Sequence, residues 1–139
     1  MIDGILDGIS RALAERFPAC QIFGDERVRQ GMQTPAFFVG LGECKLKSLP
    51  GRMLEQKQSV EVIYFPERQA DYSELWAVGP SVLLLLGELR LSDGGIIRGA
   101  VRRCDISDGL MYIRAMYTIR LRPVDTRTRM GHLWHRRRG

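Results

Sequence analysis

Hydrophobic residues recur with helical spacing over the first 17 positions of the chain. Polar residues occupy the opposite side of the same stretch, and Pro18 cannot continue a helix. The apolar stripe comprises Ile2, Ile5, Leu6, Ile9, Leu13 and Phe17. We therefore expect an amphipathic helix over residues 2–17 that packs its apolar side on a sheet.

Three strands are expected after this helix. The first covers residues 20–28, and the second, residues 36–46, follows directly after a proline. The sequence Leu49-Pro50-Gly51-Arg52 is typical of a type II turn, because proline takes its second position and glycine its third. The third strand, residues 53–65, should therefore return antiparallel to the second.

The hairpin formed by the second and third strands has unusual faces. Gly40 and Gly42 either weaken the second strand or mark a bulge in it. One face of the third strand carries Glu55, Lys57, Ser59 and Glu61, and the other carries Leu54, Gln56, Gln58, Val60, Val62 and Tyr64. Since even the second set is only half apolar, the turn end of the hairpin should project from the core and contact another chain.

A second helix and two further strands are expected in the C-terminal half. The helix should run from about residue 69 to residue 89, with Gly79-Pro80 kinking it or splitting it into two. Strands over residues 96–106 and 110–122 should form a hairpin around the Ser107-Asp108-Gly109 loop.

The element order α-β-β-β-α-β-β predicts an α+β domain over residues 1–123. We expect a mixed, mainly antiparallel sheet with two helices packed on one face. Residues 124–139 should form a basic, flexible C-terminal tail, because they hold five arginines against Asp125. The net charge of +5 thus lies almost entirely in this tail, and the domain itself is nearly neutral.

Chemically reactive motifs are not evident in the sequence. Phosphate-binding and dinucleotide-binding glycine patterns and nucleophile motifs are missing, and the three cysteines lack metal-binding spacing. His132 and His135 lie in the basic tail, where a solvated pair is favoured over a metal site. We therefore expect no catalytic residue, no metal and no cofactor, and hence not an enzyme.

A membrane partner is also not expected. The longest apolar run, residues 82–86, is too short to cross a bilayer, and the N-terminus is acidic where a signal peptide would be basic. The scattered cysteines suit a reducing, cytosolic setting.

Arginines gather on the C-terminal hairpin and could serve two different purposes. They are Arg98, Arg102, Arg103, Arg114, Arg120 and Arg122. A nucleic-acid surface would use Arg114, Arg120 and Arg122, which share one strand face, but only Tyr112 offers a base-stacking ring there. The favoured alternative is a solvated or subunit-facing surface whose arginines pair with acids. Glu55, Glu61 and Asp105 are the acids expected in that role.

The basic tail contains Trp134, flanked by Leu133 and Met130. A tryptophan in such a segment either remains in a disordered tail or anchors it on a partner surface, since aromatic residues dominate interface energetics.

Several short motifs, in order along the chain, resemble a family of phage tail terminator or tail-completion proteins found in tailed phages and prophages. The matching landmarks are Ile2-Asp3-Gly4-Ile5 with Ala12-Leu13, the block from Glu26 to Val39, Tyr64-Phe65-Pro66, Asp93-Gly94 with Arg98-Gly99, and Asp108-Gly109 with Tyr117. The basic tail after Pro123 departs from the pattern of the family.

The resemblance implies a structural virion protein. It would form a ring of six subunits that caps the tail tube and joins it to the head-side connector, after assembly in the host cytoplasm. Candidate subunit-interface residues are Glu55, Lys57, Glu61, Arg98, Arg102, Arg114, Arg120 and Arg122, with Trp134 as a candidate partner anchor. The alternatives are a nucleic-acid-binding accessory protein, which is less favoured, and another neck or head-completion protein.

Overall fold

Two helices and a twisted mixed sheet form the computed structural model, which describes residues 2–24, 33–68, 71–123 and 134–136. The helices are α1 (Ile2–Arg16) and α2 (Tyr72–Leu85). The strands are β1 (Gln21–Phe23), β2 (Ala36–Leu49), β3 (Met53–Phe65), β4 (Glu88–Arg90), β5 (Ile96–Ser107), β6 (Leu110–Pro123) and β7 (Trp134–Arg136). This confirms the expected α+β class.

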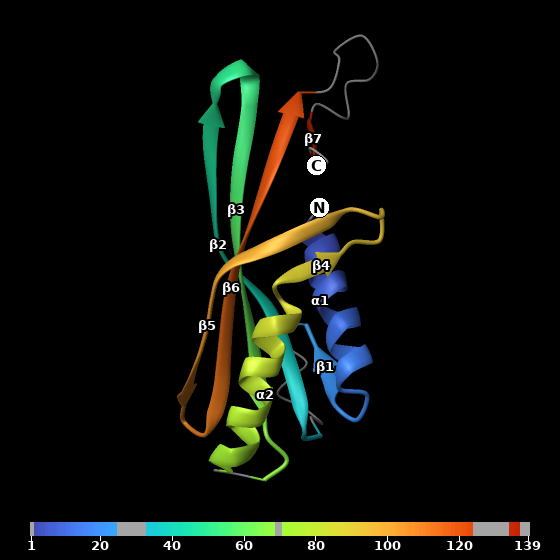
Figure 1. Ribbon diagram of the computed structural model, residues 1–139, viewed down its shortest axis with the longest axis vertical. Helices are drawn as coiled ribbons and strands as arrows, with labels where there is room; N and C mark the ends of the chain where they lie inside the picture. The colour runs from blue at the N-terminus through green and yellow to red at the C-terminus, as the bar shows by residue number, and fades with distance from the viewer. Residues whose placement is uncertain (1, 25–32, 69–70, 124–133, 137–139) are drawn as a thin grey trace.

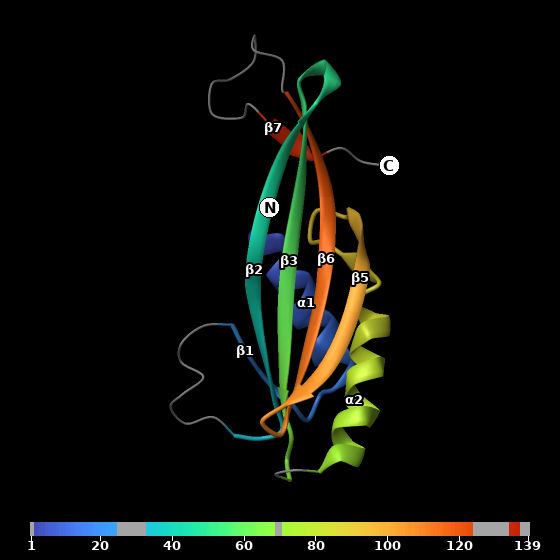
Figure 2. The same cartoon turned by 90° about the vertical axis from the view of Figure 1, so that its left-hand side faces the viewer.

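The sheet has the order β1-β2-β3-β6-β5-β4, and β7 pairs with the end of β6. β1 runs parallel to β2, and the other pairs are antiparallel. Both helices cover the same face of this sheet, which we call the inner face, and leave the other face, the outer face, toward the viewer in Figure 2.

The apolar stripe of α1 packs on the inner face, as its spacing predicts. Ile5, Ile9 and Leu13 are fully buried in the same core as Val60 and Val62 of β3. Burying an aliphatic side chain of this size contributes about 1.5–3 kcal/mol. The α1 stripe therefore fixes the helix on the sheet.

The hairpin loops follow the turn chemistry of the sequence. Gly51 has a φ of 76°, and Arg52 follows with a φ of 62°, so residues 50–52 connect β2 to β3. In the loop between β5 and β6, Asp108 and Gly109 have φ angles of 53° and 75°, as a two-residue type I′ turn requires.

The expected split of α2 at Gly79-Pro80 and the expected end of the helix near residue 89 are both wrong. The helix is continuous through Pro80, because Pro80 is exposed and the carbonyl it leaves without a helical donor can hydrogen-bond to water. The helix also ends at Leu85, not at residue 89. Residues 88–90 instead form β4, which pairs with the start of β5.

Two bulges lie at the same height on opposite sides of the sheet, and we call this level the waist. In β2 the register shifts between Leu41 and Cys44, as the glycines there suggested. In β5 it shifts between Ala100 and Arg103. Bulges increase local twist, and in Figure 1 the strands cross at this level.

Beyond the waist, the β2–β3 hairpin extends past both helices with the end of β6 (Figure 1). We call residues 44–58 of this hairpin the arm. The side chains of β2 are exposed from Leu41 to Ser48, whereas the half of β3 nearest α2 alternates between buried and half-buried positions. Most of the core thus lies on the side of the waist nearest α2, and Ile119, opposite Gln56, extends it into the base of the arm.

Candidate interaction surface

The outer face of the sheet carries rows of charged and polar side chains. Strand alternation and register place on it Lys45 and Lys47 of β2, Glu55, Lys57, Ser59 and Glu61 of β3, Arg114, Thr118 and Arg120 of β6, and Arg103 and Asp105 of β5. In the described part of the chain, no helix or strand lies over this face (Figure 2). It is therefore available to other molecules.

Two arginines of this face form ion pairs within the subunit. Arg114 lies opposite Glu61, with Nε 3.0 Å from Oε2, and its Nη1 lies 3.9 Å from Oδ1 of Asp105. Arg120 lies opposite Glu55, with Nε 3.8 Å from Oε2. These are the acids that the sequence suggested as partners. Exposed ion pairs contribute about 0–1 kcal/mol each, so they orient the side chains more than they stabilise the fold.

The structure thus brings five of the candidate interface residues onto one face: Glu55, Lys57, Glu61, Arg114 and Arg120. Lys57 lies between Lys45 and Thr118 in the register and is exposed. Arg122 is also exposed and lies opposite His135 of β7.

Arg98 and Arg102 lie away from this group. Arg98 pairs with Glu88 of β4, with Nε 3.7 Å from Oε2. The bulge in β5 turns Arg102 to the inner side, where its Nη1 donates a hydrogen bond of 2.7 Å to the carbonyl of Leu83. That contact caps the end of α2, where a cation is favoured by the helix dipole.

Trp134, the candidate partner anchor, begins β7 opposite Pro123. The structure describes its backbone alone. Residues 25–32, most of which belong to the block from Glu26 to Val39, and residues 124–133 lie outside the described part of the chain.

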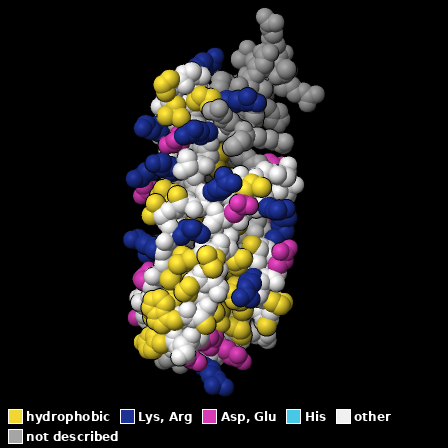
Figure 3. Space-filling view, viewed as in Figure 1, with side chains coloured by type: hydrophobic (Ala, Val, Ile, Leu, Met, Phe, Trp, Pro, Cys, Tyr) yellow, Lys and Arg dark blue, Asp and Glu magenta, His cyan; other side chains and the backbone are white. Residues whose placement is uncertain are grey.

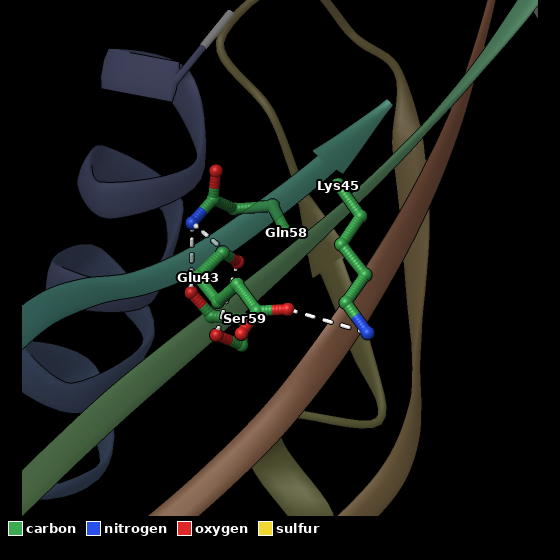
Figure 4. Close-up of polar contacts among 4 residues, drawn as sticks. All are labelled: Glu43, Lys45, Gln58 and Ser59. Carbon is green, nitrogen blue, oxygen red and sulfur yellow. Dashed lines mark hydrogen bonds and ion pairs between the residues drawn. The ribbon is translucent and has the colours of Figure 1, made fainter. Parts of the chain in front are cut away.

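A polar cluster that the sequence pattern does not predict holds the β2 bulge (Figure 4). Gln58 is only 1% exposed, and its Nε2 donates to the carbonyls of Ser59 at 2.9 Å and Gly42 at 3.3 Å. Ser59 Oγ donates to the carbonyl of Glu43 at 3.1 Å. A Cβ at position 42 would lie 2.6 Å from Ser59 Oγ and would displace this hydroxyl from its hydrogen bond to Glu43. The one signal for the cluster in the sequence is Gly42 inside a strand opposite polar residues.

Glu43 also contacts Lys45 at the base of the arm. Lys45 Nζ lies 3.3 Å from Oε1 of Glu43, and Figure 4 shows the pair beside the bulge. The backbone of Glu43 is thus tied to β3 while its side chain is tied to the outer surface of β2.

Two tyrosines fasten α2 to the sheet. Tyr64 OH donates a 2.5 Å hydrogen bond to Oε2 of Glu74, and Tyr117 OH donates a 2.6 Å bond to the carbonyl of Leu86. Burial raises the pKa of both phenols, and at Tyr64 the hydrogen bond to Glu74 raises the pKa further. Both side chains therefore remain neutral donors and fix the two ends of the helix.

The described residues contain no group of three or more His, Cys, Asp or Glu side chains placed to hold a metal ion. Among the same residues, no helix is long and apolar enough to cross a membrane.

A family model described as phage tail terminator protein matches residues 4–129, which cover α1 from Gly4, all of α2 and the strands β1 to β6. No curated protein matches the chain.

Proposed function

Because the chain belongs to the phage tail terminator family, we propose that six copies form a ring that caps the tail tube and joins it to the head-side connector. The family is a structural, non-enzymatic kind of protein, so the chain is a structural component of the phage tail. Ring assembly would take place in the host cytoplasm before the tail joins the head.

The observation that carries this proposal is the arm with its uncovered outer face. A ring built by rotation needs two different patches on each subunit, one for each neighbour. The arm projects past the helices and offers one such patch, and the β5–β6 hairpin offers another with Arg103, Arg114 and Arg120. In this arrangement the arm of one subunit meets the C-terminal hairpin of the next.

The experiment that tests the proposal is the solution mass of the full chain by light scattering at low and at high salt. We expect a discrete multimer near six subunits that persists at high salt, because exposed charge pairs contribute little and apolar contacts would hold the ring. A variant without residues 124–139 serves as the control and should form the same multimer. A chain that remains monomeric and does not bind purified tail tubes would contradict the proposal.

A further inference from the structure

Large hydrophobic side chains are exposed on two opposite flanks of the sheet. The described residues with this property near α2 and β5 are Tyr72, Trp76, Leu84, Ile96 and Val101, which we call the α2 flank. Those on β2 are Leu41 and Leu46, which we call the β2 flank. The strand order places β2 and β5 on opposite sides of the central pair β3–β6, and Figure 2 shows α2 and β2 on opposite sides.

The outward side of α2 is apolar where a surface helix is normally polar. Tyr72, Trp76 and Leu84 are 56%, 54% and 79% exposed and recur at multiples of four residues, so they lie along one side of the helix. The only charged side chain within α2, that of Glu74, is bonded to Tyr64. In Figure 3, hydrophobic side chains gather in the lower half of the molecule, where α2 faces the viewer.

The two flanks are level with each other at the waist. Leu41 pairs with Val60, which pairs with Ala115 of β6, and the β5 bulge with Val101 lies opposite Ala115. One row across the sheet therefore ends in an exposed leucine on one side and an exposed valine on the other. The hydrogen bond from Arg102 to the Leu83 carbonyl joins this end of the row to α2, between the chain neighbours of Val101 and Leu84.

Val101 has a backbone conformation that its side chain disfavours. Its φ is 50°, which is unusual for a β-branched residue, and the side chain is 78% exposed. Nothing in the described subunit uses the exposed isopropyl group, although glycine or asparagine would suit the backbone better. Strained positions of this kind cluster at functional surfaces.

The occupant that fits both flanks is a second copy of this chain. A ring contact joins one patch to a different patch on the next subunit, and two apolar flanks at equal height on opposite sides of one sheet meet that requirement.

We propose that Val101 and Leu84 of one subunit pack against Leu41 and Leu46 of its neighbour and form the apolar centre of the ring contact. This contact rests on the proposed ring and names the residues that close it. The charged residues of the outer face would surround it, as polar rims surround the cores of interfaces.

The test uses Val101→Gly, because glycine accepts positive φ and removes only the side chain that the contact needs. We expect the fold to be at least as stable as wild type, while the concentration at which the multimer dissociates rises about tenfold or more. Asp108→Gly is the matched control, since Asp108 also has positive φ but lies in the β5–β6 loop. That variant should assemble like wild type.

Covalent capture provides a second readout. In a Cys44→Ser background, oxidation of the Leu41→Cys, Val101→Cys double variant should give a ladder of linked subunits, and each single variant should give none. A multimer that tolerates Val101→Gly and does not form this ladder overturns the contact but leaves the ring. A wild-type chain that remains monomeric and does not bind tail tubes overturns both.

Discussion

At the scale of single residues, Gln58 determines how the β2 bulge is held. Its amide is buried and donates to carbonyls on both strands, at Gly42 and Ser59. Without it, the extra residue of the bulge would leave these partly buried carbonyls with fewer donors within the subunit. The side chain thus replaces part of the strand ladder that the bulge interrupts.

Gln58→Leu should lower the free energy of unfolding by about 1–3 kcal/mol, because it removes the hydrogen bonds from this buried amide to the partly buried carbonyls of Gly42 and Ser59. Denaturant unfolding followed by circular dichroism measures the change. Gln56→Leu is the matched control, since Gln56 is half-buried on the same face and its amide contacts only Cys44 Sγ, at 3.4 Å. Equal stability of the Gln58→Leu protein and wild type would show that the amide does not support the bulge.

The sequence predicts much at this scale, but not the direction of every side chain. The alternation of β3 and β6 correctly separates the buried residues Val60, Val62 and Ile113 from charged Glu61 and Arg114. Arg102 could not be placed in the same way. One extra residue in β5 reverses the alternation there and turns its guanidinium to the end of α2.

At the scale of elements, α2 shows how tertiary packing overrides a local signal. Pro80 predicts a break, yet Val78 and Val82 on either side are buried in the core and hold the helix in one piece. Its first turn is fixed by Asp71, whose Oδ1 accepts from the N–H of Glu74 at 3.2 Å. The helix therefore persists because both its cap and its buried side are satisfied.

Pro80→Ala should raise the free energy of unfolding by about 1–3 kcal/mol, because alanine restores a helical hydrogen bond and removes a steric clash. Thermal unfolding measures the gain. Since Pro80 is exposed, the substitution leaves the core unchanged. A loss of stability would mean that proline helps the fold by restricting the unfolded chain.

Short elements were the hardest to predict from the sequence. β4 has three residues after a run of leucines, so it has no alternation of its own and exists because β5 pairs with it. The parallel pairing of β1 with β2 likewise depends on contacts that local sequence does not encode. By contrast, β3 and β6 were predicted almost to the residue, because each is long, alternating and bounded by turn residues.

At the scale of the whole molecule, the proposed roles of Arg114 and Arg120 can be separated from their ion pairs. Replacing both arginines with glutamate should abolish assembly. The two new carboxylates would also lie beside Glu61 and Glu55, where the wild-type arginines form ion pairs. The matched variant adds Glu61→Arg and Glu55→Arg, which restores both pairs within the subunit.

If the two arginines contact a neighbour, the fourfold variant should fold but remain monomeric in light scattering. Assembly of that variant would show that the arginines serve only their own subunit. Either result leaves the apolar contact at Val101 open to its separate test, because the outer face and the flanks carry different residues.

The candidate surface was partly predictable from the sequence for a physical reason. Strand alternation alone places Glu55, Lys57, Glu61, Arg114 and Arg120 on one face once the two strands are paired. The exposure of Trp76 and Leu84 was not predictable, because an apolar helix looks the same in sequence whether its second side is buried or free. Only the arrangement of α2 at the edge of the sheet reveals it.

The unbroken pairing of β3 with β6 has a mechanical consequence. It runs from Leu54 opposite Leu121 to Tyr64 opposite Met111 without a shift, whereas both flanking strands are bulged at the waist. Antiparallel hydrogen bonds lie across the strands, so tension along the long axis loads this central ladder in shear, with its bonds sharing the force. The bulged flanks are more compliant. A subunit built this way would resist extension along its long axis mainly through its two central strands.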